Sequence, residues 1–303
     1  MTSIGVSNQA VHAAVVTEKK ANVVDELTKE TIKLSISQSQ QDAKEETIQY
    51  SEEELEAIQA VYDKLTKEDK IEGSKIGLRA LALTTIVSKL RVDEAAEKYG
   101  KFLKALETVD IHGISFSDTE VDSYMKNSEV SKQLGAYAVC GKDNEGRSIF
   151  WIKGKEILPG EETAAMHAGV LYWLAIHADK KSLHEGITFC IDTSSRTSMS
   201  KHGNESKLQK INQSFPLRPQ AIKIAGASMV MRVAINGLLK VASLFTKQKI
   251  LQRIQFVTVK QALESIPKES SPKYLGGFGG HIDNEEAWIA QRIHSFPIPS
   301  IKR

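Results

Sequence analysis

The stretch GITFCIDT, residues 186–193, decides the fold because it reads as a strand that is buried on both faces. Continuous runs of apolar and β-branched residues are typical of strands in parallel sheets that helices cover on both sides. A second run of this kind, AIKIAGAS, follows at 221–228. Since the segment Glu205–Gln213 between them reads as a helix, the pattern indicates an α/β fold with a mainly parallel sheet.

The flanking segments continue this alternation. Residues 136–154 read as strand, turn and strand, with turn chemistry in the stretch KDNEGR. A helix at Glu161–Ala178 precedes the first buried strand. Downstream, the sequence predicts a strand in ILQRIQFVTV at 250–259, a short helix at Val259–Ser265 and a final helix at Asn284–His294.

The amino-terminal part is different in character. Residues 1–48 are rich in Ser, Thr, Gln, Lys and Glu and are expected to be mostly disordered. Ser51 followed by Glu54 forms a capping box, which predicts the start of a helix. Further helices are expected in IGLRALALTTIVSKL and VDEAAEKYGKFLKALETV, the second with Asp93 as its N-cap.

Composition excludes several classes of protein. The formal net charge is +2, so the chain as a whole does not favour nucleic acid. No uninterrupted apolar run reaches the ~20 residues of a membrane-spanning helix. Cys140 and Cys190 lie in strand-like runs and are expected to be buried free thiols rather than a disulfide, as in a reducing cytoplasm. We therefore expect a soluble cytoplasmic protein.

Motifs for catalysis and metal binding are missing from the sequence. There is no nucleophile elbow, zinc-protease motif, phosphate-binding loop or paired CxxC. His167 and His177 lie ten residues apart, which is the wrong spacing for a metal site on one helix. Asp192 ends a buried strand, where it caps the local backbone or, with a partner such as His202, acts in catalysis. We expect no enzymatic activity, no cofactor and no metal.

Acidic and basic residues are distributed unevenly along the chain. Between Glu205 and Glu264 there is no acidic residue, while ten basic residues occur. Within this interval, MVMRVAINGLLKVASLF (residues 229–245) predicts a helix that is apolar over most of its circumference. This helix is a core helix, a lid over an apolar cavity, or a helix that meets an anionic membrane surface. Nucleic acid fits less well, because aromatic residues are not interleaved with the cations.

The order of these elements resembles that of the CRAL-TRIO lipid-binding family. The resemblance covers about residues 50–285 and depends on six strings in order. They are GLRALALTTIVSKLRVDEAAEKYGKFLKAL, KDNEGRSIFWIKG, GITFCIDTSS, LQKINQSFPLRPQAIKIAGAS, FTKQKILQRIQFV and IPKESSPKYLGG.

The resemblance implies an N-terminal helical subdomain followed by an α/β sandwich, whose mainly parallel sheet floors an apolar lipid pocket gated by a helix. The expected parts are a disordered tail at 1–48, a helical region at 49–115, a lipid-binding domain at 120–285, and a C-terminal helix and tail at 286–303. The gate would be the segment 229–245, called the gate segment below. The expected gate residues are Met231, Ile235, Leu238, Leu239 and Phe245, and the expected pocket walls are Phe150, Ile152, Phe189, Ile191, Ile224 and Val230.

The resemblance also implies a headgroup site. In the tocopherol-transfer branch, cations bind a phosphoinositide headgroup, and Arg218, Lys249 and Arg253 match three such positions. In the fungal branch an acidic residue after a Tyr-Pro pair contacts inositol, whereas this chain reads Phe215-Pro216-Leu217. An external contact with anionic lipid is therefore favoured over a phosphatidylinositol molecule bound inside.

The resulting hypothesis is a monomeric lipid-binding or lipid-transfer protein that associates transiently with anionic membranes. Its partners would be a hydrophobic lipid and a phosphoinositide-containing surface, not nucleic acid. Two alternatives remain: a phosphoinositide-sensing adaptor that recruits proteins through residues 1–48, and an α/β enzyme that uses Asp192.

Overall fold

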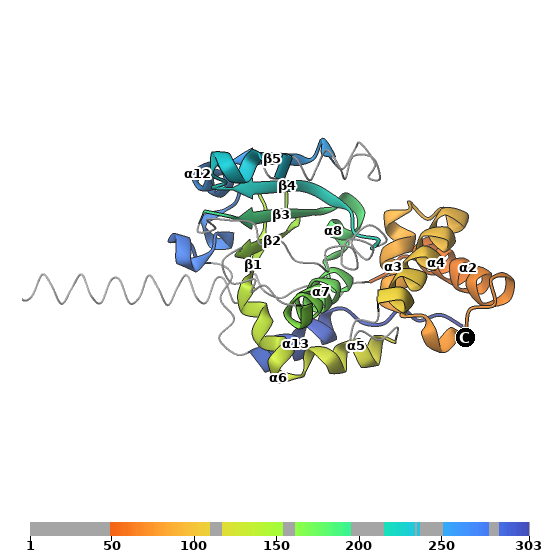
Figure 1. Ribbon diagram of the computed structural model, residues 1–303. Coiled ribbons are helices and arrows are strands. Elements are labelled where there is room, and N and C mark those ends of the chain that lie inside the picture. The colour runs from red at the N-terminus through yellow and green to blue at the C-terminus, as the bar shows by residue number, and fades with distance from the viewer. Residues whose placement is uncertain are drawn as a thin grey trace, which may run out of the picture. The chain divides into compact units, whose positions relative to one another are not determined.

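The computed structural model describes residues 49–109, 117–153, 161–194, 215–233, 235–236, 251–278 and 285–302 (Figure 1). All of them belong to the unit Thr47–Arg303. The strands are β1 (Tyr137–Lys142), β2 (Ser148–Lys153), β3 (Ile187–Asp192), β4 (Pro219–Ala225) and β5 (Ile254–Val257). The α-helices before the sheet are α2 (Glu52–Asp63), α3 (Leu78–Val87), α4 (Val92–Val109), α5 (Asp118–Met125) and α6 (Ser128–Ser131). Those after β2 are α7 (Glu161–Ile176), α8 (Lys180–Glu185), α12 (Val259–Glu264) and α13 (Glu285–Ser295).

Local sequence explains where the first helices begin. The predicted capping box of α2 is confirmed, since Ser51 Oγ accepts from the Glu54 N–H at 3.2 Å and Glu54 Oε2 accepts from the Ser51 N–H at 2.6 Å. The predicted N-cap of α4 is wrong. The Ala95 N–H already donates to the carbonyl of Arg91, so the helix starts earlier and Asp93 lies in its first turn. There the Asp93 carboxylate pairs with Lys64 at 2.9 Å.

The sheet has the strand order β1-β2-β3-β4-β5. Strands β1 and β2 pair antiparallel, and every other neighbouring pair is parallel, which confirms the predicted mainly parallel sheet. The turn between β1 and β2 depends on Asp143, whose Oδ1 accepts from the N–H groups of Glu145 and Arg147, both at 2.9 Å. Gly146 supplies the positive φ of 79° that this turn requires.

The two faces of the sheet pack against different helices. One face joins Phe150 and Phe189 to a core with helices α2, α3, α4 and α7. On the opposite face, Trp151 and Cys190 pack with Ala262 of α12. Strand β3 contributes to both cores, and the prediction that it is buried on both faces is confirmed.

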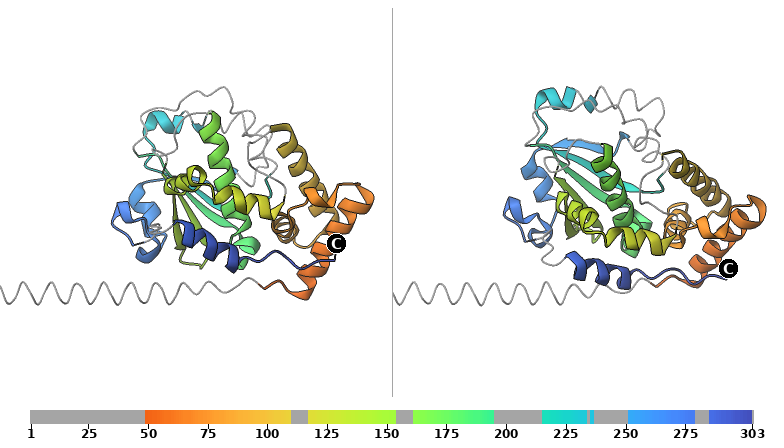
Figure 2. Two further views of the ribbon diagram at one scale, coloured as in Figure 1. Left: turned by 90° about the horizontal axis from the view of Figure 1, so that it is seen from below. Right: turned by 60° about the horizontal axis from the view of Figure 1, so that its bottom comes forward.

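The parallel strands begin and end at different groups of helices. Strands β3 and β4 start beside α8, which contacts α3. The described turns of the gate segment follow the end of β4 and lie at the opposite end of the sheet from α2 and α3 (Figure 2). The sheet therefore has an amino edge next to the helical region and a carboxyl edge next to the start of the gate segment.

Candidate functional site

Apolar residues form two rows across one face of the sheet, called the apolar face below. The parallel register places them side by side. The first row contains Phe150, Phe189, Ile222 and Ile254, and the second contains Ile152, Ile191, Ile224 and Phe256. Because side chains alternate along a strand, residues two apart share a face, so both rows lie on the same side of the sheet.

The apolar face is covered unevenly. Its members on β2 are buried, whereas Ile222, Ile254 and Phe256 on β4 and β5 are only half-buried. The core on this side of the sheet includes an aromatic group from α4, α7 and the segment before β4. In that group the ring of Phe215 lies 5.5 Å from Phe102 and 5.4 Å from Tyr172. The more open half of the apolar face is therefore the half beside the gate segment.

Five of the expected pocket-wall residues lie on the apolar face, and the sixth does not. The five are Phe150, Ile152, Phe189, Ile191 and Ile224. Val230 lies beyond the end of β4, in the first turn of the gate segment, and its side chain is 75% exposed. Sequence alternation along each strand could not establish which face carries a helix cover, whereas the register places all five together.

The described start of the gate segment has two different sides. Met231 is 4% exposed and packs with Ile224 and Ala227, while Ile235 and Phe256 pack against this small cluster. Met229, Val230 and Val233, called the exposed trio below, point into solvent. These described turns therefore pack on Ile224 with one side and present apolar side chains outward with the other. The expected gate residues Leu238, Leu239 and Phe245 lie outside the described residues.

Two of the three expected headgroup residues lie together at the amino edge of the sheet. Arg218 immediately precedes β4, and Arg253 immediately precedes β5. The Arg253 guanidinium donates to the carbonyl of Pro219, the residue next to Arg218. Arg218 Nη1 donates to the carbonyl of His184 at 2.7 Å. Lys249, the third expected residue, lies outside the described residues.

The charges of this basic pair, Arg218 and Arg253, are not neutralised by nearby carboxylates in the part of the chain that the structure describes. Both guanidinium groups bond to backbone carbonyls, and both side chains are half-exposed. Strand β4 separates the pair from the exposed trio by about 20 Å, at roughly 3.3 Å per residue. The described start of the gate segment and the basic pair therefore lie at opposite ends of β4.

Asp192 is fixed by structural hydrogen bonds. Its Oδ1 accepts from the N–H of Ser194 at 3.0 Å and from the Ser194 hydroxyl at 2.6 Å, and Oδ2 accepts from the Tyr274 hydroxyl at 2.7 Å. The interpretation of Asp192 as a local backbone cap is therefore confirmed. His202, its suggested catalytic partner, lies outside the described residues. Within the described ranges, no group of three or more His, Cys, Asp or Glu residues could hold a metal ion.

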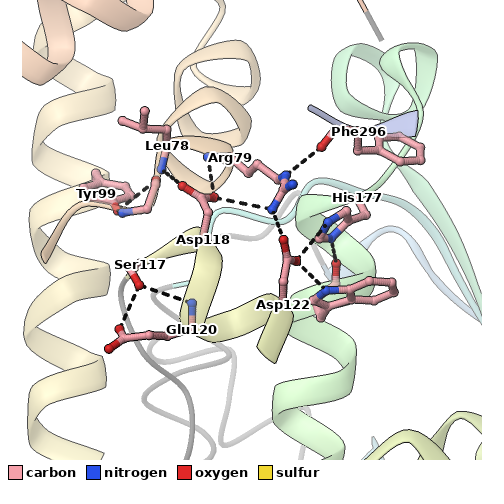
Figure 3. Close-up of polar contacts among 11 residues, drawn as sticks. Leu78, Arg79, Tyr99, Ser117, Asp118, Glu120, Asp122, His177 and Phe296 are labelled. Carbon is pink, nitrogen blue, oxygen red and sulfur yellow. Dashed lines mark hydrogen bonds and ion pairs between the residues drawn. The ribbon is translucent and has the colours of Figure 1, made fainter. Parts of the chain in front are cut away.

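A buried polar cluster, which no sequence pattern indicated, joins α3, α5, α7 and the residue that follows α13 (Figure 3). Arg79 Nη1 donates to Asp122 Oδ2 at 2.8 Å, and Arg79 Nε donates to the carbonyl of Phe296 at 2.7 Å. Asp118 accepts from the backbone N–H groups at the start of α3, from Leu78 at 2.6 Å and from Arg79 at 3.0 Å. Sequence reasoning missed this cluster because its members come from distant parts of the chain.

His177 completes the buried polar cluster. Its Nδ1 lies 2.8 Å from the carbonyl of Trp173, which can only accept, so Nδ1 carries the proton. Its Nε2 lies 3.4 Å from Asp122 Oδ1, the atom that also accepts from Trp173 Nε1 at 3.0 Å. Burial lowers the pKa of His177 to about 4, although Asp122 acts in the opposite direction.

The two carboxylates of the cluster respond differently to their surroundings. Burial raises the pKa of Asp118 above its usual value, despite the two backbone N–H groups and Arg79. Burial also acts to raise the pKa of Asp122, but the His177 ring in its protonated form and the Arg79 guanidinium outweigh it and lower the pKa. Asp122 is therefore the ionised centre of the cluster.

A comparison with models of protein families agrees with this architecture. Residues 132–277 match the family model described as the CRAL/TRIO domain, and this range contains all five strands. Residues 132–277 form a CRAL/TRIO domain. The match supports lipid binding or lipid transfer in general terms, and it places the apolar face, the basic pair and the exposed trio within one domain.

The other comparisons are less informative. A solved structure described as "Crystal structure of Sfh5" shares 11% sequence identity with this chain, covering 81% of this chain and 98% of the other, at a TM-score of 0.38. No curated protein matches the chain. Across the described residues, no helix is both long and apolar enough to cross a membrane.

Proposed function

We propose that this protein binds one hydrophobic lipid against the apolar face of its CRAL/TRIO domain and transfers or presents that lipid at membranes. The observation that carries the proposal is the half-buried part of the apolar face on β4 and β5, which lies beside the gate segment. An acyl or isoprenoid chain on this face would gain ~0.8 kcal/mol for each methylene removed from water. No chemical step is required, and the proposed function is not enzymatic.

Membrane contact is the second part of the proposal. The exposed trio would enter the apolar boundary of a bilayer, while Arg218, Arg253 and Lys249 contact anionic phosphoinositide headgroups. Opening of the gate segment would then uncover the apolar face at the membrane rather than in water. The protein would act as a cytoplasmic monomer that associates with membranes transiently.

Lipid occupancy tests the first part. Native mass spectrometry of protein purified from cells should reveal a bound lipid. Ile222→Trp places a large ring on the half-buried apolar face and should reduce the fraction of protein with lipid. Gln255→Trp is the matched control, because Gln255 is exposed and lies on the opposite face of the sheet.

Two results would contradict the lipid-binding proposal. One is a protein that is always empty after purification and also fails to extract lipid from vesicles. The other is equal lipid occupancy in the parent protein and Ile222→Trp, together with loss of lipid in Gln255→Trp. That result would place the lipid on the side of the sheet opposite the apolar face.

A further inference from the structure

The backbone around Arg218 is held by a very close approach to Gly186. Gly186 joins α8 to β3 with a φ of 106°, a region that disfavours residues with a β-carbon. A β-carbon at this position would lie 2.6 Å from the carbonyl oxygen of Arg218 and 3.1 Å from the amide nitrogen of Gln220. The next residue, Ile187, donates its N–H to the same Arg218 carbonyl at 2.9 Å. Only glycine allows the two strands to start this close together.

The side chain of Arg218 is held from the same turn. Its Nη1 donates to the carbonyl of His184 at 2.7 Å. His184 lies in the last turn of α8, where carbonyl groups have no partner within the helix and favour a cation. The turn His184–Gly186 therefore holds both the backbone and the guanidinium of Arg218.

This turn is tied to the helical region by the ring of His184. His184 Nε2 lies 2.8 Å from Glu54 Oε1, and Lys180 Nζ lies 3.0 Å from Glu54 Oε2. Glu54 is only 3% exposed and belongs to the capping box that starts α2. A chain of contacts thus runs from the first turn of α2 through His184 to Arg218.

We infer that Gly186 and His184 are positioning residues for the headgroup site, and that they couple Arg218 to the start of α2. Gly186 sets the path of the backbone, and His184 supplies the carbonyl that orients the Arg218 guanidinium at the sheet edge that also carries Arg253. The inference rests on the proposed function, since it concerns how well the basic pair meets an anionic headgroup.

Alanine substitutions at two glycines, Gly186 and the control Gly276, test the inference. Binding to phosphatidylcholine vesicles is measured by sedimentation, with and without a phosphatidylinositol bisphosphate. Arg218→Ala should weaken binding to the phosphoinositide vesicles about fivefold. Gly186→Ala should give a similar loss, and Gly186→Ala combined with Arg218→Ala should bind no worse than Arg218→Ala alone. Gly276→Ala is the control, since Gly276 also has a positive φ, 82°, but a β-carbon there meets nothing within 4 Å.

The outcomes separate the two proposals. If Arg218→Ala binds like the parent, the headgroup site itself is wrong. If Arg218→Ala loses binding while Gly186→Ala does not, the positioning inference is overturned and the headgroup site stands. If the effects of Gly186→Ala and Arg218→Ala simply add, Gly186 acts elsewhere and the inference also fails.

If Gly186→Ala does not fold, a second pair of variants tests the positioning role of His184. His184→Leu removes the contact with Glu54 and should weaken binding to phosphoinositide vesicles. His184→Gln restores a side-chain N–H that reaches Glu54 and should recover much of that binding. Equal binding by both variants, at thermal stabilities like the parent's, would overturn the role of His184.

Discussion

Arg79 and Asp122 form an ion pair of 2.8 Å between α3 and α5 that is almost fully withdrawn from solvent. Arg79 also bonds to the carbonyl of Phe296, which lies 217 residues further along the chain. Through one guanidinium, the helical region before the CRAL/TRIO domain is joined to α5 and to the segment after α13. The domain and its flanking helices therefore belong to one compact unit, Thr47–Arg303.

Removal of one partner of this ion pair should destabilise the folded protein. Asp122→Ala leaves the Arg79 charge buried without its carboxylate, and we expect a loss of about 3–5 kcal/mol in the free energy of unfolding. Urea denaturation measures the loss. Asp63→Ala is the control, because Asp63 pairs with Lys67 on the surface and its removal should change stability far less. Similar losses in both variants would show that the buried ion pair contributes no more to the free energy of unfolding than a surface ion pair does.

His177 should make the folded state sensitive to mild acid. Its pKa falls from 6.5 to about 4 on folding, so the unfolded chain binds the proton first as the pH decreases. Stability from this group is complete above pH 6.5 and is lost as the pH falls from 6.5 to about 4. The total is roughly 3 kcal/mol, at 1.36 kcal/mol for each pKa unit.

Thermal or urea unfolding between pH 7 and pH 4 tests this assignment. His177→Phe cannot take up a proton and should flatten the decline in that window. His294→Gln is the comparison, because His294 is exposed whereas His177 is buried. A His177→Phe protein that declines as steeply as the parent would assign the acid sensitivity to another group.

The basic pair should control binding to anionic vesicles. Arg218→Ala combined with Arg253→Ala removes two cations, each worth about 1 kcal/mol near an anionic surface, so binding should fall by roughly thirtyfold. Added salt should then have less effect, because fewer charges remain to be screened. Lys67→Ala in the helical region is the control for loss of a surface cation. Unchanged sedimentation of the double variant with vesicles would exclude the basic pair from membrane contact.

The two sides of the gate segment should respond differently to substitution. Val230→Ser changes a side chain that is 75% exposed and should weaken vesicle binding with little effect on stability. Met231→Ala removes a side chain buried on Ile224 and should destabilise the fold by about 2–5 kcal/mol. Vesicle sedimentation and urea denaturation of both variants give the comparison. The opposite pattern would mean that the exposed trio does not meet lipid.

Much of the architecture could be predicted from local patterns. The capping box at Ser51 and Glu54, the turn at Asp143 and the buried strand β3 each have a sequence signal of short range, and each is confirmed. The prediction of Asp93 as the N-cap of α4 was wrong. Asp93 is a residue type that often caps helices, but here it lies inside the first turn. For the candidate site, the sequence identified apolar strands and local cations but not their spatial relations.

By itself, the sequence determined the alternation of helices and strands, the mainly parallel sheet and the bias toward cations between Glu205 and Glu264. These features follow from periodicity and composition, which are local properties of a chain. Only the tertiary structure decided which side of each strand forms the apolar face, that Arg218 and Arg253 lie at one edge of the sheet, and that Gly186 must pass close to Arg218. It also decided the cluster of Arg79, Asp122 and His177. Contacts of this kind depend on how distant segments pack, and no local pattern encodes the partner of a buried charge or the register of a strand.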